Sequence, residues 1–255
     1  GITGTDVSKE AADMVLADDN FASIIAAVEE GRAIFANIRK FLRYLLSSNI
    51  GEVLAMFFGV ILADTIGLYA EEQLIVLPLL ATQLLWINLV TDGAPALALG
   101  VDPPDASVMR KPPRAKNEGV ITRQMWSGIV YVGLIMGAST LVVLDASLPG
   151  GFIEGSGSMR YAQTMAFTTL VLASLFNVLN ARSDEQSAFL GLFSNKWLVA
   201  SIALSVLLQI AVVYVPFLQL AFSTVSLNIE DWILCTLAAS SVLWLRELSK
   251  LIKRN

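Results

Sequence analysis

The sequence predicts an all-α membrane protein with six transmembrane helices and a short cytosolic segment before them. Of its 255 residues, 55% are hydrophobic and 15% are charged, against roughly 25% charged in an ordinary soluble domain. The mean hydropathy is +0.66. Six apolar stretches each have about 20 residues, the length that crosses about 30 Å of hydrocarbon. Basic residues concentrate in alternate loops, which is typical of a multi-pass membrane protein.

The N-terminal part, residues 1–23, is polar and acidic and differs from the rest of the chain. Its pattern predicts a turn, then a short helix over 7–15, then the end of a strand and a turn over 15–19, as at the end of a soluble cytosolic domain. No proline interrupts residues 21–63. We therefore expect one helix of roughly 60 Å at 1.5 Å per residue, whose first part, 24–41, forms a cytosolic stalk.

The six apolar stretches differ in strength. They are 42–63, 75–98, 125–145, 161–181, 197–220 and 230–248. The last has the shortest uninterrupted apolar run, and we retain it because Arg246 and Lys250 can extend their charged ends to the membrane interface.

Loop charges predict the orientation of these spans. The basic residues are Lys9, Arg32, Arg39, Lys40 and Arg43, then Arg110, Lys111, Arg114, Lys116 and Arg123, then Arg182 and Lys196, and finally Arg246, Lys250, Lys253 and Arg254. The alternate loops carry Asp64, Glu71, Glu72, Asp145, Glu154 and Glu230, with Arg160 as their basic residue. Positively charged loops face the cytosol, so both termini and the 99–124 loop are expected there.

The composition also excludes several functions. The chain has no histidine and one cysteine, Cys235, which excludes a disulfide framework and a thiolate or imidazole metal site. We find no nucleic-acid-binding motif. The expected partner is the lipid bilayer, with no nucleic acid.

Five polar residues inside the first two spans are the main functional signal. An ionisable group at bilayer depth costs at least about 2.5–3.5 kcal/mol and usually marks an ion or proton path. Glu52 has Asn49 at helical spacing before it, and Asp92 has Asn88 and Thr91. Together they offer carboxylate, amide and hydroxyl oxygens, which suit Ca²⁺, Mg²⁺ or Mn²⁺, and Ca²⁺ best. We therefore interpret these five residues as metal ligands.

Structural alternatives exist for several of these signals. Glu52 alone could be a buried carboxylic acid that bonds another helix, and the Thr91 hydroxyl could bond its own helix. Gly93 and Pro95 should loosen the helix after Asp92, which either frees backbone groups for an ion or merely kinks the helix for packing.

Other polar residues are interpreted as structural. We expect Asn177, Asn180 and Gln209 to make hydrogen bonds between helices. Adjacent carboxylates at a turn are usually solvated capping groups, and we interpret Asp18 and Asp19 in this way rather than as a metal pair.

Several segments closely resemble the C-terminal part of P-type calcium-transporting ATPases of the sarco/endoplasmic reticulum type. The matching segments are 4–21, 28–35, 47–52, 85–93 and 102–105, the last being Asp-Pro-Pro-Asp. The resemblance implies that 1–23 ends an α/β phosphorylation domain, 24–41 is a stalk, and 42–255 is the cation-transport domain with helices five to ten of a ten-helix pump. It places Asn49 and Glu52 on the fifth helix and Asn88, Thr91 and Asp92 on the sixth, as cation ligands.

The sequence also departs from that family. It does not contain the phosphorylation motif, the nucleotide and actuator domains or helices one to four, so we expect a longer parent that supplies them as partners and uses ATP and Mg²⁺. This chain alone should not hydrolyse ATP, and we assign it no catalytic or cofactor-binding residue. Ser174 stands where two-calcium pumps carry an eighth-helix glutamate.

These departures shape the predicted function. We expect a pump that exports one Ca²⁺ per ATP, with Asp92 central, Asn88 its neutral partner, and Glu52 serving proton countertransport. The alternatives are a Mn²⁺ pump, or a complete six-span passive channel or interaction subunit. A reading frame that continues upstream through a phosphorylation motif would favour the pump. The acidic composition favours a bacterial plasma membrane.

Overall fold

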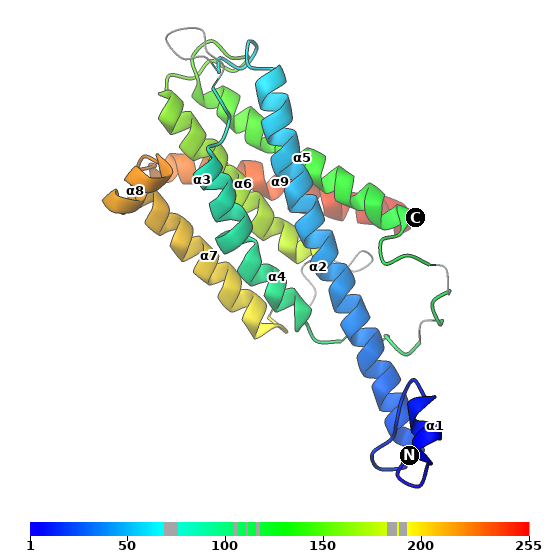
Figure 1. Cartoon of the computed structure of the whole chain (residues 1–255). Helices are drawn as coiled ribbons and strands as arrows, with labels where there is room; N and C mark the ends of the chain where they lie inside the picture. The colour runs from blue at the N-terminus through cyan, green and yellow to red at the C-terminus, as the bar shows by residue number, and fades with distance from the viewer. Residues whose placement is uncertain are drawn as a thin grey trace.

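The protein is a bundle of helices, with the N-terminal end of one long helix extending beyond it (Figure 1). The computed structural model describes residues 1–68, 76–104, 107–110, 112–115, 118–182, 188 and 193–254. Within these residues the secondary structure is helical and includes no strand, in agreement with the predicted all-α class. Five residues used in the sequence analysis lie outside the described part: Glu71, Glu72, Asp105, Lys111 and Lys116. The same holds for residue 75, where the second predicted span begins.

The N-terminal segment forms less regular structure than predicted. Helix α1 covers Asp6–Glu10, with the Thr5 side chain accepting a hydrogen bond from the Ser8 backbone N–H, and none of its residues is buried. The predicted helix over 7–15 is therefore too long, and 15–19 form no strand. Without tertiary packing, a helix of this length has little to stabilise further turns.

The long helix is confirmed. Helix α2 covers Phe21–Ile61, 41 residues, and Asn20 caps its start by accepting a hydrogen bond from the Ala22 N–H. Its second half packs closely against α5, Arg123–Ser147. A Cβ atom on Gly133 of α5 would lie only 2.5 Å from Ile50 of α2, so a small residue is needed for this close approach.

The second predicted span is interrupted. Residues 76–80 are not helical, α3 covers Ala81–Trp86, a π-helical turn covers Ile87–Thr91, and α4 covers Gly93–Gly100. The Asp92 N–H bonds the carbonyl of Ile87, five residues back, at 2.8 Å. The predicted span over 75–98 is therefore not one regular helix, because the π-helical turn is wider than an α-helix and Pro95 has no N–H to continue the regular ladder. The break that we expected from Gly93 and Pro95 is confirmed.

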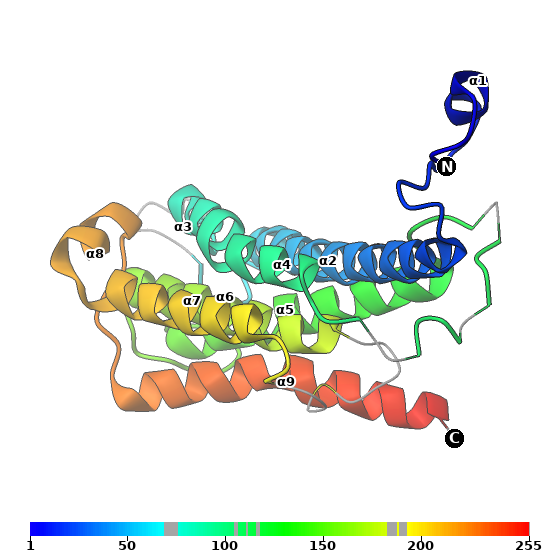
Figure 2. The ribbon, with the colours of Figure 1, turned by 90° about the horizontal axis from the view of Figure 1, so that it is seen from below.

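The remaining helices surround α6. Helix α6, Met159–Ala181, is buried along most of its length, and α7, Lys196–Tyr214, lies beside it with α3 and α4 (Figure 2). The fifth predicted span, 197–220, is too long, because α7 ends before Pro216 and a new helix, α8, covers Pro216–Phe222. Proline disfavours a helical conformation at the residue before it.

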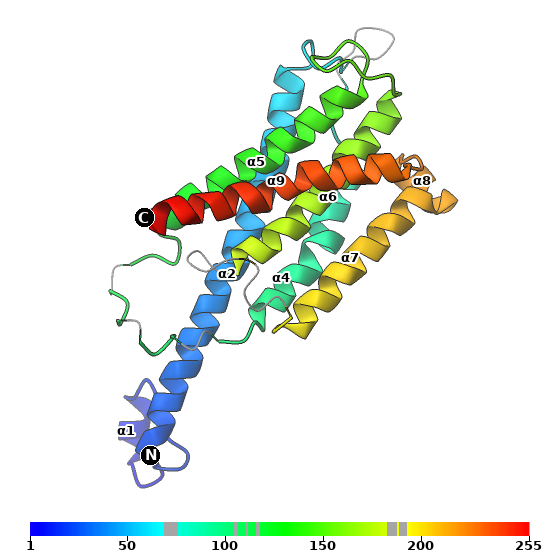
Figure 3. The same ribbon diagram turned by 180° about the vertical axis from the view of Figure 1, so that it is seen from behind.

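The last helix crosses the back of the bundle. Helix α9, Ile229–Arg254, lies over α5 and α6 (Figure 3). That Arg246 and Lys250 reach the membrane interface stays a prediction; within the bundle they are 7% and 5% exposed. Arg246 packs over Gly128 of α5, and Lys250 forms an ion pair with Glu247 at 2.8 Å. Both lie against protein because α9 packs along its neighbours.

Four of the described helices, α2, α5, α6 and α7, are long and apolar enough to cross a membrane, by length and composition. The multi-pass character of the chain is thus supported. The count of six spans stays a prediction, because the second span is divided at Asp92 and α9 carries several charges.

Candidate functional site

The two carboxylates inside the predicted spans face one region between α2, the break before α4, and α6. Glu52 is 7% exposed and Asp92 is fully buried. The Asn88 amide donates to Glu52 Oε2 at 2.6 Å, and the Tyr44 hydroxyl donates to Asp92 Oδ1 at 2.9 Å. The hydroxyl of Ser174 on α6 faces the Asp92 carboxylate. The site therefore joins α2, the interrupted helix and α6.

Each carboxylate has an oxygen without a partner. Glu52 Oε1 and Asp92 Oδ2 are buried and accept no hydrogen bond within the part of the chain that the structure describes, and Ser174 Oγ makes none either. Leaving a buried carboxylate oxygen unpaired costs free energy, and in folded proteins such an atom commonly lies where a water or an ion binds. These three oxygens are therefore the candidates for contact with a water or an ion.

The other predicted ligands have different surroundings. Thr91 is buried, and its hydroxyl donates to the Ile87 carbonyl at 3.0 Å, so the back-bonding interpretation is confirmed while its oxygen keeps lone pairs. Asn49 is exposed, and its side chain makes no hydrogen bond to any described residue. The contacts thus bring Glu52, Asn88 and Asp92 into the site and leave Asn49 on an outer face of α2.

Sequence reasoning missed two residues of the site. Tyr44 contacts Asp92, and the hydroxyl of Ser48 also faces that carboxylate. Tyr44, Ser48 and Glu52 are spaced four residues apart on α2, which places them on one helix face. That spacing was visible in the sequence and could have identified both residues.

The residues interpreted as structural make the expected contacts. Asn177 of α6 donates to Ser47 of α2 at 2.7 Å, and Asn180 donates to the Val242 carbonyl of α9 at 3.1 Å. Gln209 of α7 donates to the Thr168 hydroxyl of α6 at 3.3 Å. These interhelical bonds are confirmed. Near α1, Asp18 accepts hydrogen bonds from the Asn20 N–H and the Ser23 hydroxyl at the start of α2, which agrees with a capping role.

The donor chemistry limits what the site could hold. Among the described residues, no group of three or more His, Cys, Asp or Glu side chains lies together. A cation here would be held by two carboxylates with neutral amide and hydroxyl oxygens. Such a set favours hard divalent cations over zinc or copper.

Residues 76–252 match the family described as "Cation transporting ATPase, C-terminus". The chain belongs to this family. It is similar to proteins named "Calcium-transporting ATPase" from Bacillus subtilis (44% identity over 92% of this chain), "Calcium-transporting ATPase 1" from Bacillus cereus (39% over 100%) and "Calcium-transporting ATPase 1" from Yarrowia lipolytica (42% over 98%). The resemblance noted from the sequence is confirmed.

The matched relatives are much longer than this chain. The chain spans 25% to 29% of the lengths of these three relatives. Its interrupted helix and the following helices lie within the matched region, which includes Asn88 and Asp92 but begins after Glu52.

Proposed function

We propose that this chain is the ion-binding transmembrane part of an ATP-driven pump that exports Ca²⁺ from the cytosol. The observation that carries the proposal is the pair of buried carboxylates, Glu52 and Asp92, each with one oxygen free of any described hydrogen bond. The names of the relatives favour calcium as the ion. They also favour a pump over a passive six-span channel.

Asp92 is the central ligand of the proposed site. It is completely buried and lies where the regular helix is broken, a position at which membrane transporters often bind ions. Asn88, Thr91 and Glu52 supply the nearest additional oxygens. Asn49 lies on an outer face of α2, and we propose that it acts as a ligand only together with the parent's remaining helices.

Ser174 sets the proposed stoichiometry. Its buried hydroxyl faces Asp92 but contributes no carboxylate, so the site has charge for one divalent cation rather than two. We propose one Ca²⁺ per ATP, with Glu52 carrying a proton in the return direction. Mn²⁺ is the second candidate cargo, because an oxygen-only donor set also suits it.

The same proposal assigns the rest of the chain. Residues 1–23 end the phosphorylation domain, 24–41 form the stalk, and 42–255 form six transmembrane helices with both termini in the cytosol of a bacterial cell, in the plasma membrane. The continuity of α2 from Phe21 to Ile61 supports a mechanical connection between stalk and site. The parent supplies the actuator and nucleotide domains, the rest of the phosphorylation domain and helices one to four, and it uses ATP and Mg²⁺.

Radioactive Ca²⁺ bound per phosphorylatable site in the purified full-length parent tests this proposal. We expect about one bound ion per protein, because two carboxylates together with neutral oxygen ligands balance the charge of one divalent cation. Asp92→Asn should abolish binding, and Glu52→Gln should retain it. Asp145→Asn is the matched control, because Asp145 is also buried but its carboxylate accepts the Phe152 and Ile153 N–H groups.

The outcomes separate the alternatives. Binding of two ions would mean that Ser174 or water replaces the missing carboxylate. Binding of Mn²⁺ without Ca²⁺ would change the cargo, and binding of neither would remove the cation-site assignment. If Asp145→Asn and Asp92→Asn lost Ca²⁺ binding equally, the effect would be due to misfolding.

A gain of function gives a second test. Ser174→Glu should raise the number of bound Ca²⁺ ions from about one to about two, because it adds a carboxylate next to Asp92. Ser174→Gln is the control of similar size without the charge. An unchanged ion count in Ser174→Glu would show that the position of Ser174 does not determine the stoichiometry.

A further inference from the structure

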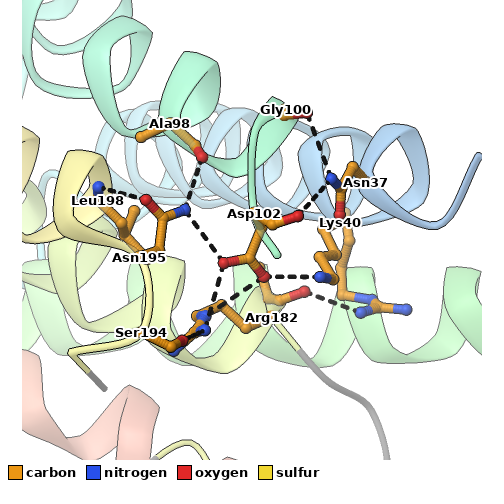
Figure 4. A network of polar contacts seen from close by, with 11 residues as sticks. Asn37, Lys40, Ala98, Gly100, Asp102, Arg182, Ser194, Asn195 and Leu198 are labelled. Carbon is orange, nitrogen blue, oxygen red and sulfur yellow. Dashed lines mark hydrogen bonds and ion pairs between the residues drawn. The ribbon is translucent and has the colours of Figure 1, made fainter. Parts of the chain in front are cut away.

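A second buried carboxylate cluster lies at the far end of α4 (Figure 4). Asp102 is 4% exposed. Lys40 Nζ of α2 is 2.6 Å from its Oδ2, and Arg182 Nη2, at the end of α6, is 3.2 Å from its Oδ1. The Asn195 amide, at the start of α7, also donates to Oδ1, at 3.1 Å. Both oxygens of this carboxylate are therefore paired, and the partners come from three other helices.

The same cluster holds the last turn of α4. Asn37 of α2 donates to the carbonyls of Gly100 and Asp102 at 3.3 and 2.7 Å, and Asn195 donates to the Ala98 carbonyl at 2.8 Å. The final carbonyls of a helix have no partner within it, and its negative end favours nearby cations. The amides and cations around Asp102 therefore fix the C-terminal end of α4.

Helix α2 therefore makes contacts next to both ends of α4. Tyr44 bonds Asp92 just before α4, and Lys40 pairs with Asp102 just after it. Lys40 and Tyr44 are one helical turn apart on α2. A rotation or shift of α2 cannot leave both contacts intact unless α4 moves with it.

We propose that Asp102, Lys40 and Arg182 form a clamp that positions Asp92 for the cation. The clamp makes the position of α4, and with it the geometry of the candidate site, depend on the stalk part of α2. This inference rests on the proposed function, since it concerns the affinity of the same site. Asp102 and Lys40 are positioning residues: they contact no ligand and act through α4 and Tyr44.

The test measures Ca²⁺ affinity and site number separately in the full-length parent. Lys40→Met and Asp102→Asn should lower the Ca²⁺ affinity by about threefold to thirtyfold, the range for mutations that alter coupling between sites. The number of Ca²⁺ sites per phosphorylatable protein should not change. Lys40→Arg should restore most of the affinity, because it keeps the charge facing Asp102.

The neighbouring residue provides the matched control. Arg39→Met removes a cation from the same turn of α2, but Arg39 pairs with the more exposed Glu118 at 3.9 Å. It should leave Ca²⁺ affinity unchanged. A double-mutant cycle with Tyr44→Phe tests positioning separately. If one clamp holds both ends of α4, the effects of Lys40→Met and Tyr44→Phe on Ca²⁺ affinity should be non-additive.

Three results would overturn the clamp. One is an affinity in Lys40→Met no lower than that in Arg39→Met, and another is additivity with Tyr44→Phe. The third is a loss of Ca²⁺ sites without a change of affinity, because that result indicates misfolding only. If Asp102→Asn does not fold, the comparison of Lys40→Met with Lys40→Arg tests the clamp. Failure of the proposed function is distinguishable, because the wild-type protein would then bind no Ca²⁺ or Asp92→Asn would still bind it.

Discussion

Asp92 lies just before helix α4 and Asp102 lies just after it. Both are buried, yet their carboxylate oxygens have different partners. Asp102 pairs with two cations and an amide. Asp92 receives one neutral hydroxyl bond, from Tyr44, and its second oxygen has no hydrogen-bond partner among the described residues. The charge of Asp102 is neutralised within the chain. Asp92 remains available to a positive charge from outside it.

Glu52 belongs with Asp92 in this comparison. It receives one amide bond from Asn88, and its other oxygen is also unpartnered within the described residues. Burying charges without pairing them costs stability, and functional sites commonly carry such a cost. The comparison supports the proposal that the membrane cluster, Glu52 with Asn88 and Asp92, binds a cation, whereas the contacts of Asp102 hold helices together.

The largest expected difference concerns stability. Asp102→Asn leaves the partly buried Lys40 and Arg182 without their carboxylate, and we expect it to lower the free energy of unfolding by about 3–5 kcal/mol. Chemical denaturation of the protein in detergent micelles measures this. Glu118→Gln is the control, with an expected change of about 0–1 kcal/mol because its ion pair is solvated. Equal effects of the two substitutions would remove the distinction between a buried and a surface ion pair.

The next difference concerns the response to calcium. At a Ca²⁺ concentration of about 100 times Kd, binding should stabilise the wild-type protein by about 2.7 kcal/mol. In Asp92→Asn this stabilisation should disappear, while stability in chelator should not fall, since the substitution removes a buried carboxylate with one oxygen that has no hydrogen-bond partner among the described residues. Thermal unfolding of the full-length parent with Ca²⁺ or chelator measures both effects. Asp102→Asn should show the reverse pattern, losing stability in chelator while still responding to Ca²⁺.

Sequence reasoning predicted the membrane cluster better than the Asp102 cluster for a physical reason. A carboxylate within an apolar run is anomalous by itself, so Glu52 and Asp92 were visible without any tertiary information. Asp102 lies in a Pro-rich loop with basic residues, where a charge is ordinary. Its burial depends on Lys40, Arg182 and Asn195, which are separated from it by 62, 80 and 93 residues.

The fold shows the same division between local and long-range information. The length of α2 followed from a stretch free of proline, and the break near Asp92 followed from Gly93 and Pro95. The burial of Arg246 could not be predicted, because it depends on how α9 crosses Gly128 of α5. The exposure of Asn49 was missed because i,i+3 spacing places two residues on a similar face but does not fix what covers each of them.

A neutral polar contact in the membrane should matter less than either carboxylate. The Gln209 amide donates to the Thr168 hydroxyl between α7 and α6 at 3.3 Å. A double-mutant cycle with Gln209→Leu and Thr168→Val should give a coupling energy of about 0.6 kcal/mol, the average for interhelical hydrogen bonds in a membrane protein. Unfolding in micelles measures it. A coupling energy as large as the stability loss expected for Asp102→Asn would show that charge does not explain the large effect of Asp102.

The smallest effect is expected at a carboxylate that is paired but exposed. The Ser23 hydroxyl, and secondarily the Asn20 N–H, hold the pKa of Asp18 below its ordinary value of 3.8. A carboxyl group whose pKa is lower in the folded protein stabilises it above the ordinary pKa, and this contribution is lost as the pH falls through the lowered pKa. The gain should be small because water screens an exposed group.

Amide hydrogen exchange at the start of α2 tests this effect. Asp18→Asn should increase exchange of the Ala22 and Ser23 N–H groups at neutral pH, and the difference from wild type should disappear in acid. Asp13→Asn, in the same exposed segment, should change neither. A difference that persists below the lowered pKa would show that the Asp18 charge is not its cause. Loss of the difference in acid would place Asp18 with Asp102 as a carboxylate stabilised by its own chain, with solvent exposure accounting for the smaller effect.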